Sequence, residues 1–480
     1  MKTDKENKGI TTRAENYSEW YLDIIEAAEL AENGPAKGTM IIKPYGFAIW
    51  ELIQAELDHL IKQTGVQNAY FPLLIPEKLL QREKEHVEGF SPELAVVTIA
   101  GGKKLKENYV IRPTSETIMY ETFAKWVRSH KDLPLLINQW NNVVRWELRP
   151  RLFLRTTEFL WQEGHTAHAT EKEADERAQL MLQIYTDFAK NFLAIPCLAG
   201  AKSNAEKFAG AQTTYSVEAM MQDGKALQFA TSHNLGQNFS KPFNIRFQTE
   251  DSSEKFAWQT SWGLSTRVIG GLIMTHSDDK GLVLPPNVAP IQAVIIPIWK
   301  DAITKKEILK KAGSILSELE KNNLRVKLDD RDSRPGEKYY EWEKKGVPVR
   351  IEIGPKDLEK NSAVLARRDE DSKTNVNLKN LADEVKKLLS EIQANLLKQA
   401  EERLKKNTKT VTTWKEFEQA IEENKFILAP WSGDAKVEAE IKKKTTATIR
   451  CLPADQPSKL GKCIYSDKPG KFLALFAKAY

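Results

Sequence analysis

The first part of the chain alternates between segments with helical spacing of apolar residues and short apolar strands. Apolar residues recur at helical intervals over residues 17–32 and 47–63, and residues 38–42 between them are typical of a short strand. Further strands, expected to form an antiparallel sheet, are predicted at residues 69–75, 108–111, 135–146 and 159–164, with helices at 115–129 and 170–192. The pattern therefore predicts a mixed α/β (α+β) domain over this part of the chain.

The pattern changes after Asn287-Val288-Ala289-Pro290. Residues 292–298 form an apolar run of the kind buried in a parallel sheet, followed by a predicted helix at 304–322, strand at 325–328, helix at 336–345 and strand at 347–353. Alternation of this length favours a small doubly wound α/β domain. A charged helix at residues 378–406 leads into a third, mixed α/β unit, residues 410–480. We expect domains at residues 1–286, 287–400 and 401–480.

Composition narrows the class of protein. The chain has 480 residues, 41% of them hydrophobic and 29% charged, and no apolar run approaches the ~18 residues of a membrane span. Residues 1–9 are polar and charged, unlike a secretory signal. Cys197, Cys451 and Cys463 are too few and too scattered for a disulfide framework. We expect a cytoplasmic protein without a membrane partner, and the net charge of +5 does not by itself establish a nucleic-acid partner.

Arginines beside aromatic residues give the strongest chemical signal. Arg145 and Glu147 lie two residues apart on a predicted strand, so both side chains should share one face, and Arg155 follows ten residues after Arg145, near Phe159. Such a hairpin can hold a triphosphate with its guanidinium groups and stack a base on its ring. An exposed strand with a solvated Arg–Glu pair is the alternative reading. Arg267 lies near the start of an apolar, helix-like stretch. The N-terminus of a helix favours the binding of anions.

Three blocks of sequence resemble motifs 1, 2 and 3 of the class II aminoacyl-tRNA synthetases. They are Lys43-Pro44-Tyr45-Gly46, the segment around Val143-Val144-Arg145-Trp146-Glu147, and Ser265-Thr266-Arg267 with the residues around it. The sequence between these blocks is similar to the sequences of the prolyl-tRNA synthetase family in particular. This closer resemblance is carried by Arg112-Pro113-Thr114-Ser115-Glu116, Trp161-Gln162-Glu163-Gly164-His165-Thr166-Ala167-His168 and Gly281-Leu282-Val283-Leu284-Pro285-Pro286.

The resemblance implies an architecture and an activity. It implies a class II antiparallel-sheet catalytic domain, a doubly wound anticodon-binding domain and a small C-terminal domain. The expected reaction activates proline with ATP and transfers the prolyl group to the 3′ end of tRNA(Pro). A homodimer is implied as well, because the motif 1 helix and strand form much of the class II dimer interface.

Roles of individual residues follow from the matching motif positions. Arg145 is expected to contact both the proline carboxylate and the α-phosphate, and Arg267 the γ-phosphate, so that these two carry the catalytic role. The other residues expected to bind ATP are Glu147, Arg155, Thr156, Phe159, Gln228, Thr231 and Ser265. Mg²⁺ is expected to arrive with ATP and to bridge its phosphates.

The expected amino-acid pocket must accept a charged secondary amine and a compact apolar ring. The resemblance assigns proline binding to Thr114, Glu116, Arg145, Trp161, Glu163, His165 and His233. A lone histidine at such a position is more often a satisfied core residue, so only the whole set supports this assignment. The spacing between His168 and Ser261 leaves too little chain for an inserted editing domain, and we expect no editing by this chain.

The remaining expectations concern tRNA and zinc. Arg350, Glu352 and Lys356 could hydrogen-bond guanine edges of the anticodon, although alternating charges also suit a plain exposed strand. The resemblance implies a comparison with zinc, because many relatives with this C-terminal unit bind a structural zinc through four cysteines. The matching positions here are Ser432, Val437, Cys463 and Ser466, and a single thiolate does not make a tetrahedral zinc site. We expect neither structural zinc nor another protein-bound metal. The unit should instead depend on its apolar core, expected to include Phe426, Ile427, Leu428, Ile449, Leu473, Leu475 and Phe476.

Two rival readings remain. Another class II enzyme, such as a threonyl or histidyl synthetase, would lack the wording of residues 112–116 and 161–168. A catalytically silent paralogue that binds tRNA or proline would be expected to have lost Arg145, Arg155 or Arg267, and all three are present.

Overall fold

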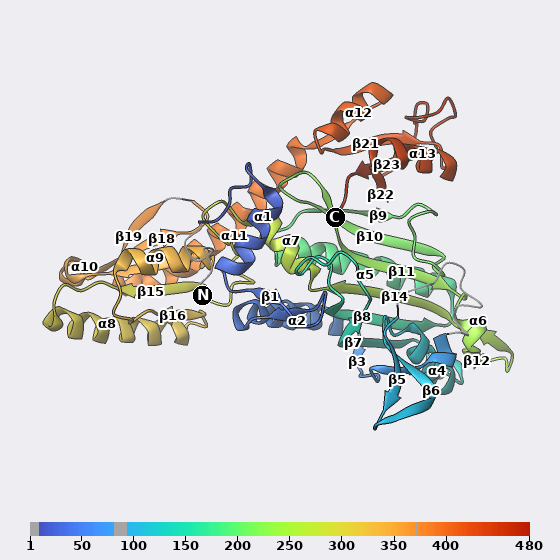
Figure 1. The fold of residues 1–480 in the computed structure, drawn as a ribbon, viewed down its shortest axis with the longest axis horizontal. Coiled ribbons are helices and arrows are strands. Elements are labelled where there is room, and N and C mark those ends of the chain that lie inside the picture. Colours follow the sequence, from blue (N-terminus) through green and yellow to red (C-terminus); the bar gives the residue numbers. More distant parts are fainter. Residues whose placement is uncertain (1–8, 81–93, 371) are drawn as a thin grey trace.

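The computed structural model describes residues 9–80, 94–370 and 372–480. The segment 1–8, which carries most of the expectation about a signal peptide, lies outside the described residues. The fold has a large sheet with helices against it, a second α/β unit to one side and a third unit whose strands extend the large sheet (Figure 1). The chain is thus of the mixed α/β class that the pattern predicts.

The large sheet has eleven strands in the order β20-β21-β23-β22-β9-β10-β11-β14-β8-β7-β3. From β22 to β7 all neighbours are antiparallel. The strands of this sheet that belong to the first part of the chain are β3 (Gln67–Asn68), β7 (Leu135–Val144), β8 (Glu158–His168), β9 (Cys197–Ala201), β10 (Thr213–Met220), β11 (Ala226–Gly236) and β14 (Trp258–Ser265).

Helices and small sheets surround these strands. Apolar residues of the helices that flank the sheet pack with those of the strands in two separate cores. The helices are α1 (Tyr17–Ala27), α2 (Pro44–Lys62), α4 (Glu116–Trp126), α5 (Glu171–Asn191), α6 (Ser240–Phe243) and α7 (Arg267–His276). The small sheets pair β1 (Ala31–Asn33) with β2 (Met40–Ile42), β4 (Leu74–Pro76) and β5 (Val96–Ala100) with β6 (Lys103–Ile111), and β12 (Arg246–Gln248) with β13 (Glu254–Phe256).

The second unit has a five-stranded sheet of order β16-β15-β17-β18-β19. Its elements are β15 (Ala293–Pro297), α8 (Ala302–Lys321), β16 (Val326–Leu328), α9 (Pro335–Lys344), β17 (Val349–Ile353), α10 (Pro355–Glu359), β18 (Ser362–Arg367) and β19 (Lys373–Asn377). The first three strands are parallel, as the alternation predicts, but β18 and β19 are antiparallel. The connections before these two strands are shorter than a parallel crossover requires, which the apolar pattern did not reveal.

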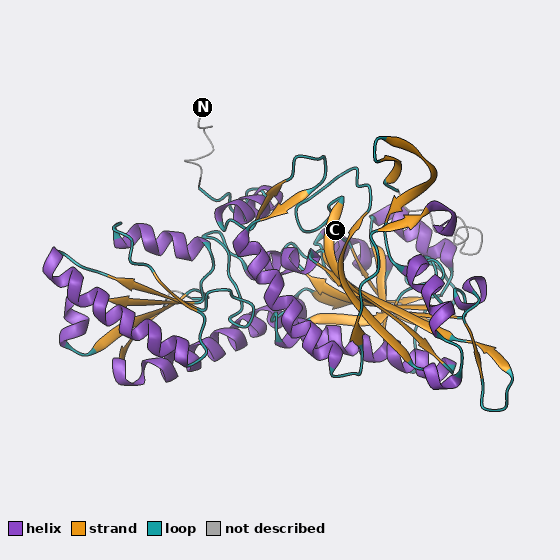
Figure 2. Ribbon diagram, turned by 90° about the horizontal axis from the view of Figure 1, so that it is seen from below, coloured by secondary structure: helices purple, strands orange, loops and turns teal. Residues whose placement is uncertain are grey.

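The long helix α11 (Leu381–Lys406) joins the second unit to the third. The third unit contains β20 (Thr408–Thr410), α12 (Trp414–Glu422), β21 (Phe426–Trp431), α13 (Ala435–Thr445), β22 (Thr448–Pro453) and β23 (Phe472–Ala477). Figure 2 shows helices alongside the fan of strands of the large sheet, and the apolar residues of α12 and α13 form one core with those of β21, β22 and β23. Of the apolar residues expected in its core, Phe426, Ile427, Ile449, Leu475 and Phe476 are buried, whereas Leu428 and Leu473 are half-buried.

The strand predicted at residues 69–75 is wrong except at its end, where Leu74 and Ile75 belong to β4. Residues 69–73 are not a strand, because their backbone groups bond to side chains and to single backbone partners from other segments. The Phe71 amide donates to the Gln139 side chain, the Phe71 carbonyl accepts from Arg112, and Pro72 has no amide to offer a ladder. The helix predicted at residues 17–32 is likewise shorter, since the chain leaves α1 after Ala27 and pairs as β1.

Gly164 is expected to be intolerant of even one added methyl group. A Cβ at this position would lie 2.0 Å from the Trp262 indole, which is buried in the main core on the neighbouring strand. Overpacking of this kind costs about 1–3 kcal/mol. We therefore expect Gly164→Ala to lower the free energy of unfolding by that amount in urea denaturation. The double variant Gly164→Ala/Trp262→Leu should recover part of the loss, and a Gly164→Ala variant as stable as the native chain would contradict this packing.

Candidate active site

Alternate residues of three central strands face one side of the large sheet. In the register of β8, β14 and β11, Glu163 pairs with Gly263 and His165 pairs with Ser261, which in turn pairs with His233. Side chains of a strand alternate between faces, so these residues share one face, while Gln162, Gly164 and Ser232 point to the other. That other face is covered by α5, since Tyr185 bonds Gln162 and Ser232 bonds the Ala178 carbonyl.

Two adjoining cavities lie over the open face. The first is lined by Glu116, Arg145, Phe159, Trp161, Glu163, His165, Gln228, Phe229, Ala230, Thr231, His233, Ser261, Trp262, Gly263, Leu264, Ser265 and Arg267. The second is lined by Arg145, Glu147, Phe153, Leu154, Arg155, Thr156, Phe159, Ser265 and Arg267. Because four residues line both cavities, the two form a single elongated site with arginines at its centre.

Arg145 lies where the two cavities meet. Its Nε donates to the Pro113 carbonyl at 2.9 Å, and its guanidinium lies 5.5 Å from the Phe159 ring centre and 5.3 Å from that of Trp161. The surrounding protein lowers the pKa of Arg145, an effect that the Glu116 and Glu163 carboxylates oppose. With Nε held, the other two nitrogens of the guanidinium can bind an anion in the cavity.

Arg267 approaches the same point from the first residue of α7, as its predicted place at a helix start requires. Its Nε donates to the Leu154 carbonyl at 3.0 Å. Burial lowers the pKa of Arg267 to about 10, and the nearby positive charges of Arg145 and Arg155 contribute. Such a concentration of cations is stabilised by a polyanionic ligand, which supplies the missing negative charge.

Glu163 is the centre of a buried polar network at the other end of the site. Its carboxylate accepts from the Ser115 hydroxyl and from Asn141 and Gln139, at 2.7 and 3.2 Å for the latter two, and lies 3.2 Å from His165 Nε2. Burial alone would raise the pKa of Glu163, but these hydrogen bonds and the charge of His165 lower it below its usual value. Glu163 is therefore an ionised carboxylate at physiological pH.

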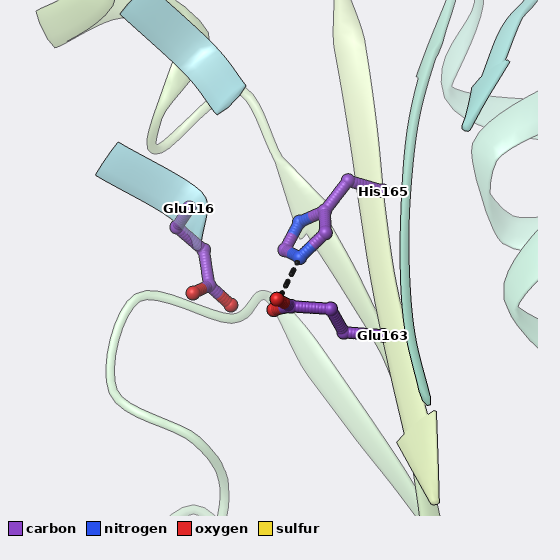
Figure 3. Close-up of side chains that lie close together, drawn as sticks. All are labelled: Glu116, Glu163 and His165. Atoms are coloured by element: carbon purple, nitrogen blue, oxygen red, sulfur yellow. Dashed lines mark hydrogen bonds and ion pairs between the residues drawn. The ribbon is translucent and has the colours of Figure 1, made fainter. Parts of the chain in front are cut away.

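Glu116 turns toward this network from the start of α4 (Figure 3). Its carboxylate accepts from the Thr114 hydroxyl. Glu116, Glu163 and His165 offer ligand atoms that all lie within 4.8 Å of one another, the one such group of three among the described residues. His233 lines the same cavity and bonds Thr214 at 2.9 Å, and burial lowers its pKa to about 3, so its imidazole is neutral. This end of the site suits a small organic cation.

The strand that was expected to carry Arg145 and Glu147 ends one residue earlier. β7 stops at Val144, and both side chains belong to the loop that follows. The Arg145 amide still donates to Thr157, but the Thr157 amide turns away to the Gly38 carbonyl, so the ladder cannot continue. The interpretation that a period of two places both residues on one strand face is therefore wrong, although both line the second cavity. Glu147 lies 3.5 Å from Arg155.

Comparison with known proteins decides the family. Residues 98–276 match the family described as tRNA synthetase class II core domain (G, H, P, S and T), residues 292–388 match the anticodon binding domain, and residues 414–480 match prolyl-tRNA synthetase, C-terminal. The chain is 51% identical to the proline–tRNA ligase of Porphyromonas gingivalis over 99% of its length and all of that protein. The chain belongs to the prolyl-tRNA synthetase family.

Further relatives agree. The proline–tRNA ligase of Amoebophilus asiaticus is 52% identical over 99% of this chain and all of that protein. A crystal structure of prolyl-tRNA synthetase from Cryptosporidium parvum, complexed with halofuginone and AMPPNP, matches with a TM-score of 0.94 and 45% identity over 98% of this chain and 99% of that one. The predicted family, fold class and enzyme class are confirmed, and the chain ligates proline to tRNA. No described helix of this prolyl-tRNA synthetase family member has the length and apolar character to cross a membrane.

The structure brings together the side chains to which the sequence assigned ATP and proline binding. All of them line the two cavities except Thr114. The Thr114 hydroxyl instead bonds Glu116, which lines the first cavity. The residues that were missed are Phe229, Ala230, Ser261, Trp262, Gly263 and Leu264 in the first cavity and Phe153 and Leu154 in the second. The alternation along β11 and β14 could have found Ser261 and Gly263. Phe229 could not be found in this way, because it lies at a bulge where Val217 pairs with Ala230 and Glu218 with Gln228.

The predicted anticodon residues lie on the second unit, away from the cavities. Arg350 and Glu352 share one face of β17, with Arg350 Nε 2.9 Å from the Glu352 carboxylate and its guanidinium 4.1 Å from the Tyr339 ring centre. Lys373 also bonds Glu352 at 2.9 Å. Lys356 is exposed on α10. An exposed strand with alternating charges and an anticodon-binding site would both show this geometry, an Arg–Glu pair at a partly open surface.

Arg112 has a role in the site that the sequence did not reveal. Its buried guanidinium donates to the Phe71 carbonyl at 2.6 Å and to the carbonyl and side-chain oxygens of Asn142 at 2.8 and 3.0 Å. Its own carbonyl accepts from Val144, next to Arg145. Arg112 therefore fixes the segment that carries Thr114 and Glu116 against the end of β7.

We expect Arg112→Met to weaken proline more than ATP. One buried and two partly buried acceptors would lose their donor, so the segment that presents Glu116 would shift relative to Arg145. The KM for proline in ATP–pyrophosphate exchange should rise about tenfold, equivalent to about 1.4 kcal/mol, with the KM for ATP changed much less. Arg112→Lys keeps the charge but not the three bonds and should behave similarly. Equal changes in both KM values would contradict the prediction.

Proposed function

We propose that the elongated site binds proline and ATP end to end and joins them at Arg145. One proline carboxylate oxygen attacks the α-phosphorus of ATP, pyrophosphate leaves, and the resulting prolyl-adenylate passes its prolyl group to the 3′ end of tRNA(Pro), releasing AMP. The observation that carries this proposal is the position of Arg145 at the junction of the two cavities. A single guanidinium there can hold the attacking carboxylate and the phosphate together.

The protein supplies position and charge to this reaction and needs no nucleophile of its own. Negative charge builds up on the oxygens of the α-phosphate during the attack, and fixed guanidinium groups stabilise it without reorganising. Arg145 acts at the α-phosphate and Arg267 at the γ-phosphate. Both side chains are held through Nε by backbone carbonyls, which leaves their remaining donors directed at the ligand.

The nucleotide subsite consists of residues around the second cavity and its boundary with the first. Phe159 stacks on adenine, Glu147 fixes the adenine or the loop around it, and Arg155 with Thr156 binds the distal phosphates. Gln228, Thr231 and Ser265 complete the wall. Mg²⁺ bound together with ATP would neutralise part of the phosphate charge. Glu147, the one carboxylate among the described residues that line the second cavity, would be the protein group available to hold it.

The proline subsite lies over Glu163. Thr114 and Glu116 accept hydrogen bonds from the secondary ammonium, and Trp161, His165 and His233 form walls around the ring. Glu163 holds Ser115 and His165 in place and adds negative charge beside the ammonium. The neutral His233 does not repel that ammonium, which supports its place in this subsite.

Amino-acid-dependent ATP–pyrophosphate exchange tests the proposed function. We expect exchange with proline and none with threonine or histidine at matched concentrations. Exchange with another amino acid would overturn the proline subsite. A folded chain that exchanges with no amino acid, yet shifts its melting temperature with proline or tRNA, would be the silent binding paralogue.

Arg350, Glu352 and Lys356 are proposed to read the tRNA anticodon. The guanidinium of Arg350 lies over Tyr339, which leaves its terminal nitrogens for the acceptor edge of a guanine. Arg350→Ala should raise the KM for tRNA in aminoacylation by roughly tenfold, because a bidentate base contact is worth about 1–3 kcal/mol. Pyrophosphate exchange, which needs no tRNA, should not change. Lys310→Ala, an exposed cation on α8, is the control, and an equal effect of both variants would contradict the assignment.

The remaining assignments concern assembly, zinc and location. The chain is proposed to act as a homodimer in the cytoplasm. It is proposed to lack structural zinc, since Cys463 is the one thiol among the four matching positions, the others being Ser432, Val437 and Ser466, and a single thiolate does not make a tetrahedral zinc site. Sedimentation of the purified protein tests the homodimer, and metal analysis tests the absence of zinc.

A further inference from the structure

The open face of the large sheet continues beyond the nucleotide cavity into a buried cluster of charges. Glu218 on β10 pairs directly with Gln228 on β11, so their side chains stand next to each other on the face that carries Thr231 and His233. Glu218 is fully buried. An ionised carboxylate at such a position requires partners, because an isolated buried charge is very costly.

Two cations surround Glu218, one from each side of a domain junction. Lys202, which follows β9, lies 2.7 Å from Glu218 Oε1. Arg450, on β22 of the C-terminal unit, reaches Glu218 Oε2 with Nε at 3.0 Å and with a terminal nitrogen at 2.9 Å. The third nitrogen of Arg450 bonds Thr448 at 3.0 Å. The carboxylate of the catalytic domain is thus held by an arginine that this domain does not contain.

The backbone of Arg450 is fixed as firmly as its side chain. Its carbonyl accepts from the Ser216 hydroxyl at 3.2 Å, and Leu452 pairs with Ala201 across the junction of β22 and β9. At the same junction a Cβ on Gly200 would lie 2.1 Å from the Leu452 carbonyl, so the two strands approach as closely as a glycine permits. Arg450 therefore cannot easily move away from Glu218.

The cluster lies close enough to the reaction centre to act on it. The charges of Glu218 and Arg450 both shift the pKa of Arg267, Glu218 upward and Arg450 downward, in addition to the larger effects of burial and of Arg145 and Arg155. The sheet strand β10, the bulge at Phe229 and the cavity wall at Gln228 connect the two places directly.

We propose that Arg450 is a positioning residue for the nucleotide subsite: the C-terminal unit, through Arg450, holds Glu218 in place beside Gln228 and so sets the wall and the charge of the ATP end of the site. The inference rests on the assignment of Gln228 and Arg267 to ATP. It gives the C-terminal unit a part in catalysis although none of its described residues lines either cavity.

The kinetic constants of Arg450 variants test the proposal in the full chain. Arg450→Met removes the charge, and Arg450→Lys keeps a charge but cannot make both bonds to Glu218 and the bond to Thr448. We expect the KM for ATP in pyrophosphate exchange to rise roughly tenfold in Arg450→Met, as for loss of one charge-assisted hydrogen bond, and less in Arg450→Lys. The KM for proline should change less than about twofold.

A variant that only destabilises the C-terminal unit is the matched control. Phe417→Leu removes a buried ring from the core of that unit, where it packs on Trp414 and Phe476, and leaves the charge cluster intact. It should lower the melting temperature without changing the KM for ATP. If Arg450→Met fails to fold, Arg450→Lys and Glu218→Gln provide the same comparison.

The outcomes separate the inference from the assignment on which it rests. An Arg450 variant with lowered stability but unchanged KM for ATP, like Phe417→Leu, would overturn the inference and leave the cluster with a purely structural role. Gln228→Ala is measured in parallel. If it raises the KM for ATP while the Arg450 variants do not, the nucleotide subsite stands and the inference fails. If neither changes it, both fail.

Discussion

Replacing Arg145 with alanine should reduce proline-dependent ATP–pyrophosphate exchange by about 10³-fold or more. The guanidinium lies at the junction of the two cavities, where its loss removes the group that aligns two anions and neutralises the charge that develops on the α-phosphate. Loss of one preorganised donor to such a charge typically costs a factor of about 10² to 10³, and Arg145 is assigned two such contacts. Exchange kinetics over a range of proline and ATP concentrations measure the effect.

Two further variants make this result specific. Arg149→Ala removes an exposed arginine four residues away that lines neither cavity, and it should leave exchange within about threefold of native, as surface substitutions usually do. Arg145→Lys keeps a positive charge but loses the planar fork and the Nε bond to Pro113, so it should recover only a small part of the activity. Native-like exchange in Arg145→Ala would refute the assigned role.

Replacing Arg267 with alanine should reduce exchange by about 10²-fold through the nucleotide alone. The assigned contact is to the γ-phosphate, far from the proline end, and the loss of a charge-assisted contact that strengthens in the transition state accounts for a factor of this size. The KM for ATP should rise and kcat should fall. Proline binding, measured by calorimetry in the absence of ATP, should stay unchanged within error.

Arg267 also makes a structural contact that has to be separated from its role at the phosphate. Its Nε holds the Leu154 carbonyl, so Arg267→Ala could shift the loop that carries Arg155. Arg155→Ala alone is the control. When Arg155→Ala and Arg267→Ala are combined, their effects on the KM for ATP should be additive in free energy only if each arginine contacts ATP independently. An Arg267→Ala variant that loses proline affinity as strongly as ATP affinity would contradict the assignment.

Local signals explain why much of the fold could be predicted. Helix α5 was expected at residues 170–192 and spans Glu171–Asn191, because Thr170 and Glu173 form a capping box that depends only on neighbouring residues. The segment 69–73 was misread as a strand because its partners are the side chains of Gln139 and Arg112, distant in sequence. An apolar run specifies burial, but it does not specify which distant groups will satisfy the backbone.

The site shows the same division. Arg145 and Arg267 could be predicted as site residues from the sequence motifs, whereas the hydrogen-bond network that holds Glu163 could not. Asn141 and Gln139 lie on β7 beside Glu163, and Gln139 is fully buried. A run of polar residues inside a strand that otherwise reads as core was a signal for such a network, since buried amides need hydrogen-bonding partners. The contact of Arg450 with Glu218 joins residues 232 positions apart and had no local signal.

The junction of β22 with β9 has a consequence for how the molecule can be divided. The predicted boundary at residue 400 separates two parts of the chain but does not separate the sheet, because β22, β23, β21 and β20 continue it beyond β9. A fragment ending near residue 400 would expose β9 as a new edge with unpaired backbone groups and would leave Glu218 with one cation instead of two. Such a fragment is expected to self-associate through that edge. In the full chain we therefore expect the catalytic and C-terminal units to fold as one unit, although they are two domains in the sequence.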